Sequence, residues 1–281
     1  MTIKEGIQKG VISLKMENID TPKMKARLIM QFVLQKDRQY IVVHDGEELT
    51  QRQEEKYKQA IDQVKQGIPL EHLTHQREFM KLTFFVDENV LIPRQDTEKL
   101  VEVVIELAKT KNKVKILDLC TGSGAIGISL AKYLPNSEIT ASDISHEAIQ
   151  IAKKNAIHNE VENQITFIES NLWENIPKEK YDIIVSNPPY IKREVIQKLE
   201  KQVRKEPIIA LDGGWDGLTF YRKIIHEAKE YLKFQGYLCL EIGYDQKEEV
   251  TELFQSQKNY GAPVCYQDYG GNNRVIISQL R

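Results

Sequence analysis

The sequence predicts an α/β fold, in which a parallel sheet has helices on both faces and follows a small helical bundle. The first observation is a repeated alternation of short apolar runs with amphipathic segments, from VKILDL at 114–119 through EITASD and ITFIES to YDIIVS at 181–186. Such alternation is typical of parallel strands joined by helices. The second is a glycine turn at 122–124, directly after the first run, and the third is a length of 281 residues, which exceeds a typical single domain.

Residues 1–75 have the periodicity of helices. The first helix is expected to end near Asn18, and the second to begin at Thr21-Pro22, where threonine precedes a proline in the first turn. A third, highly charged helix closes at Gly67. We therefore assign residues 1–75 to an N-terminal helical bundle.

Aromatic and β-branched residues gather in residues 76–92, within the run EFMKLTFFVDENVLIP. They flank Asp87-Glu88-Asn89, a typical turn sequence. We predict a β-hairpin here, with its turn at 87–89, that links the bundle to a sheet domain at 93–281.

The end of the chain predicts the remaining elements of the sheet domain. A helix from about Leu218 to Lys233 is expected to lead into the strand GYLCLEIG. The segment APVCYQDYGGNNRVIISQL, at 262–280, indicates two strands around a Gly-Gly turn. We expect these two strands to form an antiparallel pair at the sheet edge.

Composition argues against several classes of protein. A net charge of -2 provides no strong electrostatic attraction to nucleic acid. The three cysteines form no CxxC pair, and no cysteine or carboxylate cluster accompanies His72 and His75, so neither a disulfide framework nor a metal site is expected. No leader sequence and no long apolar segment is evident. We expect a cytoplasmic monomer without stable binding to membranes or nucleic acid.

The segment ILDLCTGSGAIGISLA, at 116–131, has the form of a nucleotide-binding turn between a strand and a helix. Glycine lacks a Cβ, so Gly122 and Gly124 let a ligand approach the main chain, and the following helix offers unpaired N–H groups. With Gly127 they also match the dinucleotide fingerprint GxGxxG, and Asp143 follows at about the expected ~20 residues. NAD and S-adenosylmethionine are therefore both candidate ligands.

Two aspartates follow predicted strands near this turn. Asp143 would accept hydrogen bonds from the ribose hydroxyls of either ligand. Asp118 precedes the turn, where its charge would repel a pyrophosphate but would suit the cationic amino group and sulfonium of S-adenosylmethionine. Asp118 therefore favours S-adenosylmethionine. We interpret Cys120, at the start of the turn, as a small buried residue rather than a reactive thiol.

The motif Asn187-Pro188-Pro189-Tyr190 follows the fourth predicted strand, at the edge where open α/β sheets bind ligands. Proline has no N–H, so the strand ladder ends, and the Pro188 carbonyl can face the cleft beside the Asn187 side-chain oxygen. Two adjacent acceptors match one –NH2 group. They would hold a planar amide or an exocyclic amine against a methyl donor and stabilise positive charge on its nitrogen. Tyr190 offers a flat wall.

The residues alone leave two other functions open. An amino-methyltransferase of nucleic-acid bases would use the same motif, since NPPY suits any planar –NH2 group, although no target-recognition domain or basic excess is evident. A non-catalytic nucleotide-binding or NAD-dependent protein would use the glycine turn. That function would leave NPPY and Asp118 unexplained.

Taken together, the motifs resemble the PrmC/HemK family of peptide chain release factor glutamine methyltransferases over most of the chain. They are LIPRQDTE at 91–98, ILDLCTGSGAI, the ASD that ends at Asp143, SNPPY, VRKEPIIALDGGWDGL at 203–218, LEIG at 240–243 and DYGGNNR at 268–274. The resemblance implies a Rossmann-like sheet of the class I S-adenosylmethionine-dependent methyltransferases. It also implies the activity, which is methylation of the side-chain amide nitrogen (N5) of the glutamine in the GGQ motif of class-one release factors. S-adenosylhomocysteine would be the product, and the modification would support translation termination.

The resemblance implies a role for each candidate residue. Asn187, Pro188, Pro189 and Tyr190 would bind the glutamine and carry the catalysis, and Arg94 and Glu98 would line the entrance for the substrate. The cofactor would contact Asp118, Cys120, Thr121, Gly122, Ser123, Gly124, Asp143, Asn171, Leu172 and Asn187. We further hypothesise that residues 1–75 bind the release factor, because a large protein substrate needs a docking surface beyond the catalytic pocket.

Four residues depart from the pattern of this family. Cys120 replaces the first glycine of the turn, and Asn171 stands where many relatives carry aspartate. His75 occupies a place often held by glycine, and Gln95 replaces a proline. The first two concern the cofactor pocket, and none of the four removes the amide-binding group.

Overall fold

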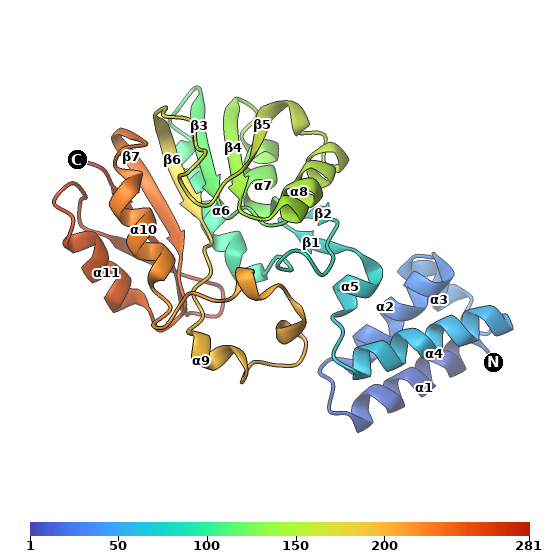
Figure 1. Cartoon of the computed structure of the whole chain (residues 1–281). Coiled ribbons are helices and arrows are strands. Elements are labelled where there is room, and N and C mark those ends of the chain that lie inside the picture. The colour runs from blue at the N-terminus through green and yellow to red at the C-terminus, as the bar shows by residue number, and fades with distance from the viewer. The chain divides into compact units, whose positions relative to one another are not determined.

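The computed structural model describes residues 1 to 281, which divide into two compact units (Figure 1). Unit 1 consists of Met1–His75 with Glu200–Lys205, and unit 2 consists of Gln76–Leu199 with Glu206–Arg281. Two separate stretches of the chain therefore contribute to each unit. None of the helices is long and apolar enough to cross a membrane.

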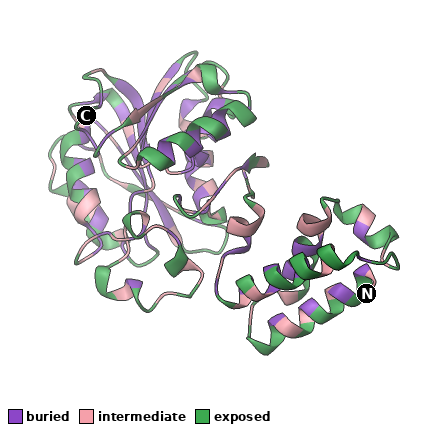
Figure 2. Cartoon of the chain, turned by 45° about the vertical axis from the view of Figure 1, so that its right-hand side comes forward, coloured by how far each residue is buried: buried purple, intermediate pink, exposed green.

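Unit 1 is a bundle of helices: α1 (Ile3–Met16), α2 (Pro22–Leu34), α3 (Arg38–Val43), α4 (Gln51–Lys65) and α5 (Leu70–Thr74). Capping boxes at Thr2 and Thr50 begin α1 and α4. As expected, α1 ends before Asn18 and α4 ends before Gly67, and both of these residues have a positive φ. The buried faces of the helices share one apolar core (Figure 2). The sequence did not predict α3 and α5, which are too short to show a clear helical period.

Unit 2 begins with a two-stranded hairpin, β1 (Arg77–Phe79) and β2 (Leu82–Phe84). Its turn is at Met80-Lys81, so the turn predicted at 87–89 is wrong. Both turn residues have positive φ, 49° and 59°, a conformation that glycine and asparagine usually supply in two-residue hairpin turns. Contacts from elsewhere hold this turn: the Met80 N–H donates to Glu98 (2.7 Å), and the Met80 carbonyl accepts from Tyr133 (2.7 Å).

The seven strands of the central sheet have the order β5-β4-β3-β6-β7-β9-β8. Strands β3 to β7 are parallel, and β9 and β8 add the antiparallel edge pair that the sequence predicts. Their bounds are β3 (Val114–Leu119), β4 (Ser137–Asp143), β5 (Ile165–Glu169), β6 (Tyr181–Ser186), β7 (Leu232–Glu241), β8 (Val264–Gln267) and β9 (Asn273–Gln279). YDIIVS is therefore the fourth strand of this sheet along the chain, as predicted.

Helices cover both faces of this sheet (Figure 1). One face packs against α6 (Glu98–Ala108), α7 (Ala125–Tyr133) and α8 (His146–His158), and the other packs against α10 (Thr219–Ala228) and α11 (Lys247–Gln255). Successive residues of β3 serve the two cores alternately, since Ile116 belongs to the first and Leu117 to the second. The helix predicted to reach Lys233 ends at Ala228, because β7 begins at Leu232 and pairs with β6.

The strand order reverses beside β3. The chain runs from β3 through β4 to β5 in one direction and then returns to β6 on the other side of β3. Such a reversal opens a crevice at the carboxyl ends of the strands. The short helical turns of the chain are α9 (Arg193–Ile196), η1 (Gln95–Thr97), η2 (Glu162–Gln164), η3 (Val203–Lys205) and η4 (Ile208–Ala210).

A buried asparagine of α8 joins the segment after the hairpin to the glycine turn. Asn155 is fully buried, and its side-chain oxygen accepts from the Phe85 N–H (2.7 Å). Its side-chain nitrogen donates to the carbonyls of Phe85 and Ser123, both at 2.9 Å. Since a buried amide needs such partners, this set of bonds fixes the start of the segment that continues to residues 89–91.

Candidate active site

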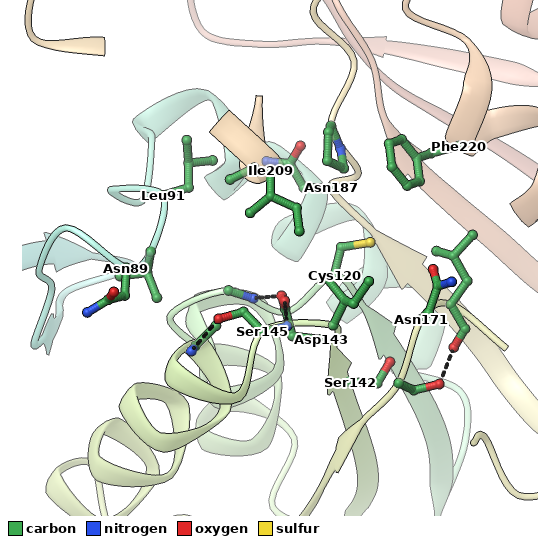
Figure 3. Close-up of a pocket in the computed structure, with 18 of the residues that line it drawn as sticks. Asn89, Leu91, Cys120, Ser142, Asp143, Ser145, Asn171, Asn187, Ile209 and Phe220 are labelled. Atoms are coloured by element: carbon green, nitrogen blue, oxygen red, sulfur yellow. Dashed lines mark hydrogen bonds between the residues drawn. The ribbon is translucent and has the colours of Figure 1, made fainter. Parts of the chain in front are cut away.

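A cavity of about 250 Å³ lies at the carboxyl ends of β3, β4 and β6, within unit 2 (Figure 3). Its position is the crevice that the strand order opens. The lining residues are Asn89, Val90, Leu91, Cys120, Gly122, Ser142, Asp143, Ile144, Ser145, Ala148, Ser170, Asn171, Leu172, Asn187, Pro189, Ile209, Ala210, Phe220 and Lys223. Seven of the predicted site residues are among them: Cys120, Gly122, Asp143, Asn171, Leu172, Asn187 and Pro189.

The floor of the cavity is the turn after β3 together with the end of β4. The Gly122 N–H donates to one oxygen of Asp143 (2.8 Å), and the Ser145 N–H donates to the other (3.0 Å; Figure 3). A Cβ added to Gly122 would meet nothing within 4 Å, so the main chain of the turn is open to a ligand. Burial raises the pKa of Asp143, and the N–H donors oppose that shift.

Asp118 does not line the cavity. Its side chain is fully buried, and one carboxylate oxygen accepts from the Thr121 hydroxyl (2.6 Å) and from the Gly127 N–H (3.0 Å). A Cβ at Gly127 would lie 3.1 Å from that same oxygen, so this glycine makes room for Asp118 rather than for a ligand. Burial raises the pKa of Asp118 to about 7. Asp118 thus braces the turn from behind, a different position from the ligand contact that the sequence suggests.

The remaining residues of the turn also divide into those that line the cavity and those that do not. Thr121 and Ser123 are buried, and Gly124 is the N-cap of α7 with a φ of 83°. None of the three lines the cavity. Cys120 does line it, and burial raises the pKa of its thiol. A raised pKa keeps a thiol protonated and unreactive at neutral pH. Cys120 also has a positive φ of 59°. Glycine adopts such a conformation readily, which explains why the family pattern has a glycine at this position.

Asn171 and Leu172 both line the cavity. Figure 3 shows Asn171 on the same side as Phe220. The Ser170 hydroxyl donates to the Leu172 carbonyl (2.8 Å), and Asn171 donates to Glu174 (2.8 Å). An apolar side chain, an aromatic ring and an amide together suit a flat heterocycle with polar edges. Asn171 and Leu172 were predicted to contact the cofactor, whereas Phe220 was not.

The NPPY motif forms the wall beyond β6. The Asn187 side-chain nitrogen donates to the Thr97 hydroxyl (3.3 Å), so its oxygen is the atom left for the cavity. The Pro188 carbonyl accepts no hydrogen bond from the main chain. Tyr190 is anchored at both ends: its carbonyl accepts from Gln246 (3.1 Å), and its hydroxyl donates to Glu241 (3.4 Å). Pro188 and Tyr190 are not among the lining residues, although both adjoin one.

Arg94 and Glu98 do not reach the cavity. Arg94 pairs with the buried carboxylate of Glu206, whose other oxygen accepts from the Ile92 N–H (2.9 Å). Glu98 accepts from the hairpin turn at Met80. Both side chains therefore hold the local fold together, and neither lines the cavity itself.

Twelve lining residues were not predicted from the sequence: Asn89, Val90, Leu91, Ser142, Ile144, Ser145, Ala148, Ser170, Ile209, Ala210, Phe220 and Lys223. Ser142, Ile144 and Ser145 lie within two residues of Asp143, so the prediction for Asp143 also pointed to its neighbours at the end of β4. Ile209 and Phe220 come from the segment after NPPY, and their sequence carries no sign that they return to this cavity.

Two family models match the chain, the PrmC N-terminal domain over residues 5–74 and the Methyltransferase small domain over residues 94–209. The Release factor glutamine methyltransferase of Clostridium acetobutylicum is 38% identical over 281 residues, which are 99% of this chain and 98% of that protein. The Release factor glutamine methyltransferase of Moorella thermoacetica is 36% identical, over 100% of this chain and 99% of that protein.

Solved structures share the fold. The catalytic domain of hMettl16, in complex with MAT2A 3'UTR hairpin 6, has a TM-score of 0.59 at 18% identity, over 75% of this chain and 80% of that one. A methyltransferase from Pyrococcus furiosus has a TM-score of 0.51 at 18% identity, over 70% of this chain and 88% of that one. These similarities confirm the predicted class I methyltransferase fold. Because the identity to its curated relatives extends over nearly the whole of both chains, this chain belongs to the family of release factor glutamine methyltransferases.

Proposed function

We propose that this protein transfers the methyl group of S-adenosylmethionine to the side-chain amide nitrogen of the glutamine in the GGQ motif of class-one peptide chain release factors. The observation that carries the proposal is the placement of the Asn187 side chain. Its nitrogen donates to Thr97, so its oxygen is available to a ligand in the cavity, which is large enough for a nucleoside. Family membership supports glutamine as the substrate amide. We place the reaction in the cytoplasm, by a monomer that forms no stable complex with nucleic acid.

The cavity suits the methyl donor. The exposed main chain at Gly122 would approach the ligand closely, and the carboxylate of Asp143 would accept from the ribose hydroxyls. Leu172 and Phe220 would contact the adenine, with Asn171 at its polar edge. S-adenosylmethionine, when bound, supplies an electrophilic methyl group on a sulfonium.

The NPPY motif would prepare the substrate amide. The nitrogen of an amide is a poor nucleophile because its lone pair is delocalised. The Asn187 side-chain oxygen and the Pro188 carbonyl would each accept one hydrogen of the –NH2 group, which fixes the nitrogen in line with the methyl. Both oxygens also stabilise the positive charge that grows on nitrogen during transfer. The proton can leave the nitrogen after the methyl has arrived, so no strong base is needed.

Mass spectrometry of a purified release factor tests the function directly. After incubation with this protein and labelled S-adenosylmethionine, we expect one added methyl on the glutamine of the GGQ motif. A release factor with that glutamine replaced should gain none. Transfer to nucleic-acid bases instead, or no transfer to the release factor, would overturn the proposal. In a thermal-shift experiment, S-adenosylhomocysteine and not NAD is expected to stabilise the protein.

Replacing Asp143 with alanine is expected to weaken the binding of S-adenosylhomocysteine about tenfold or more, because a hydrogen bond to a charged group contributes about 1.5–3 kcal/mol. Isothermal titration calorimetry measures this affinity. Glu162→Ala removes an exposed carboxylate on η2 and should leave the affinity unchanged. Equal affinities for wild type and Asp143→Ala would remove Asp143 from the cofactor site.

We also propose that unit 1 binds the release factor, outside the catalytic pocket. A groove on this unit is lined by Val11, Ile12 and Val42, together with the cations Lys4, Lys23 and Arg27. Asp45 also lines it and pairs with Lys4 (3.4 Å), so Lys23 and Arg27 supply the excess positive charge. Ile12 and Val42 are 60% and 64% exposed. Exposed apolar side chains gathered in a groove favour contact with another protein, and the cations suit a partner with acidic residues at the edge of its contact surface.

Val42→Asp should raise the KM for the intact release factor about tenfold, because it places a charge in the apolar groove. The kcat and the affinity for S-adenosylhomocysteine should stay within about twofold, since no cofactor residue is changed. Phe234→Asp is the matched control, because Phe234 is an exposed apolar residue of unit 2. A KM for Val42→Asp equal to that of wild type would argue against this groove.

A further inference from the structure

The loop between NPPY and α10 exposes three large apolar side chains close together in the sequence. Ile208 is 61% exposed, Ile209 is 52% exposed and Trp215 is 82% exposed. No other large apolar side chain of the protein is as exposed as Trp215. Single exposed apolar residues are common on protein surfaces, whereas a group of them marks a contact surface. We call these three residues the rim.

The rim adjoins the catalytic motif. Ile209 lines the cavity, and Figure 3 shows it on the same side as Asn187. Asp212 pairs in a parallel bridge with Ile191, the residue that follows NPPY. Trp215 comes three residues after Asp212, a separation that the chain spans with at most about 11 Å. A protein whose side chain reaches Asn187 therefore brings its main chain close to the rim.

Contacts on both sides of Trp215 hold its main chain in place. The Arg193 N–H donates to the Gly214 carbonyl (2.9 Å), and the Arg222 guanidinium donates to Asp216 (3.1 Å). A segment that is already ordered loses little conformational entropy when it binds a partner. The loop therefore presents the indole ring to solvent from a fixed main chain, at low entropic cost for binding.

The charges of the loop favour an uncharged partner segment. Its two aspartates are each paired with an arginine, Asp212 with Arg193 (2.8 Å) and Asp216 with Arg222. Two further cations near the loop, Lys192 and Lys223, are too few to bind a run of phosphates. Apolar side chains between paired charges suit a segment of protein without charge. The GGQ segment of a release factor is such a segment.

We propose that the rim binds the main chain of the release factor at the glycines of its GGQ motif. This inference rests on the proposed function, which places the glutamine of that motif at Asn187. Glycine has no side chain, so the flat face of the Trp215 indole can lie directly on the peptide planes that precede the glutamine. A residue with a larger side chain would hold the indole away. The rim thus favours a glutamine that follows glycines.

Trp215→Ala is expected to raise the KM for an intact release factor about tenfold, because buried tryptophans contribute much of the binding energy of protein interfaces. The kcat and the affinity for S-adenosylhomocysteine should change less than about twofold, since Trp215 does not line the cavity. Trp215→Phe keeps an aromatic ring and should restore most of the lost affinity. The melting temperature should stay that of wild type, because the replaced side chain is exposed.

Phe234→Ala is the matched control for Trp215→Ala. Phe234 is an exposed aromatic residue near the amino end of β7, whereas the cavity lies at the carboxyl ends of the strands. This variant should leave the KM for the release factor unchanged. An equal rise of KM in both variants would show that the rim has no special role and would overturn the inference.

A double-mutant cycle tests whether Trp215 contacts the glycines themselves. The change in the partner is alanine in place of the glycine directly before the glutamine of the release factor. Each single change should raise KM about tenfold, and the two together should raise it little further, because both remove the same contact.

Independent effects of the two changes, or a wild-type KM for Trp215→Ala, would overturn this inference alone. Equal KM values, with weaker binding of a single-stranded RNA by Trp215→Ala, would assign the rim to nucleic acid and likewise overturn it. A wild type that is inactive on the GGQ glutamine would overturn the proposed function.

Discussion

Replacing Asn187 with alanine is expected to lower kcat about a hundredfold or more. The variant loses one of two acceptors aimed at the reacting amide, and removing a group that stabilises charge in a transition state lowers kcat by about 10²–10³. Asn187 is only half-buried, and its single side-chain hydrogen bond goes to Thr97. The fold should therefore tolerate the change. Steady-state kinetics with a release factor and labelled methyl donor measure the effect.

The affinity for S-adenosylhomocysteine should change less than about threefold in Asn187→Ala, because the cofactor is held mainly by the turn after β3 and by Asp143. Asn171→Ala is the matched control, since it removes the same side chain from another wall of the same cavity. That variant should weaken the cofactor and leave kcat at saturation nearly unchanged. A normal kcat in Asn187→Ala would remove Asn187 from the mechanism.

The sheet was predictable because its signals are local. Each parallel strand is a short apolar run, and each run is followed by a periodic helix or a loop that brings the next strand alongside. The hairpin turn was misplaced because Met80 and Lys81 carry no turn signal, and contacts from Glu98 and Tyr133 hold them in place. Those contacts exist only once α6 and α7 have packed.

The site was predictable where one short motif supplies several groups. Gly122 and Asp143 meet across two adjacent strands, and Asn187 follows the strand beside them. The position of Asp118 was not predictable, since the sequence shows its charge but not its burial. Once buried, its carboxylate accepts from the Gly127 N–H at the start of α7. The argument that its charge would contact a cationic ligand then no longer applies directly.

The segment at 211–217 shows what the sequence could not reveal about NPPY. The Ile191 N–H donates to the Leu211 carbonyl (3.0 Å), and the Gly213 N–H donates to the Ile191 carbonyl (2.9 Å). Gln246 donates both to the Tyr190 carbonyl (3.1 Å) and to the Gly217 carbonyl (3.3 Å). The segment therefore clamps the main chain directly after NPPY, and its glycines allow the approach.

Gly213→Ala should lower kcat about a hundredfold, because a Cβ at Gly213 would lie 2.6 Å from the Tyr190 Cα and 2.7 Å from its carbonyl carbon. Neither group is a flexible side chain, so the main chain at Tyr190, the last residue of NPPY, must shift. A displacement of about 1 Å in a positioning group is enough for a 10²-fold loss. Cofactor affinity, measured by calorimetry, should fall less, because the turn after β3 is untouched.

A matched control for Gly213→Ala is Gly46→Ala, where the added Cβ would meet nothing within 4 Å. It should leave kcat, cofactor affinity and melting temperature unchanged.

Some loss of stability is expected for Gly213→Ala, about 1–3 kcal/mol for overpacking, so kcat must be measured well below the melting temperature of this variant. A folded Gly213→Ala variant with wild-type kcat would show that NPPY keeps its geometry without this close contact. A loss of kcat together with intact cofactor binding would instead tie catalysis to the main-chain position of NPPY, because Gly213 contributes no side chain of its own.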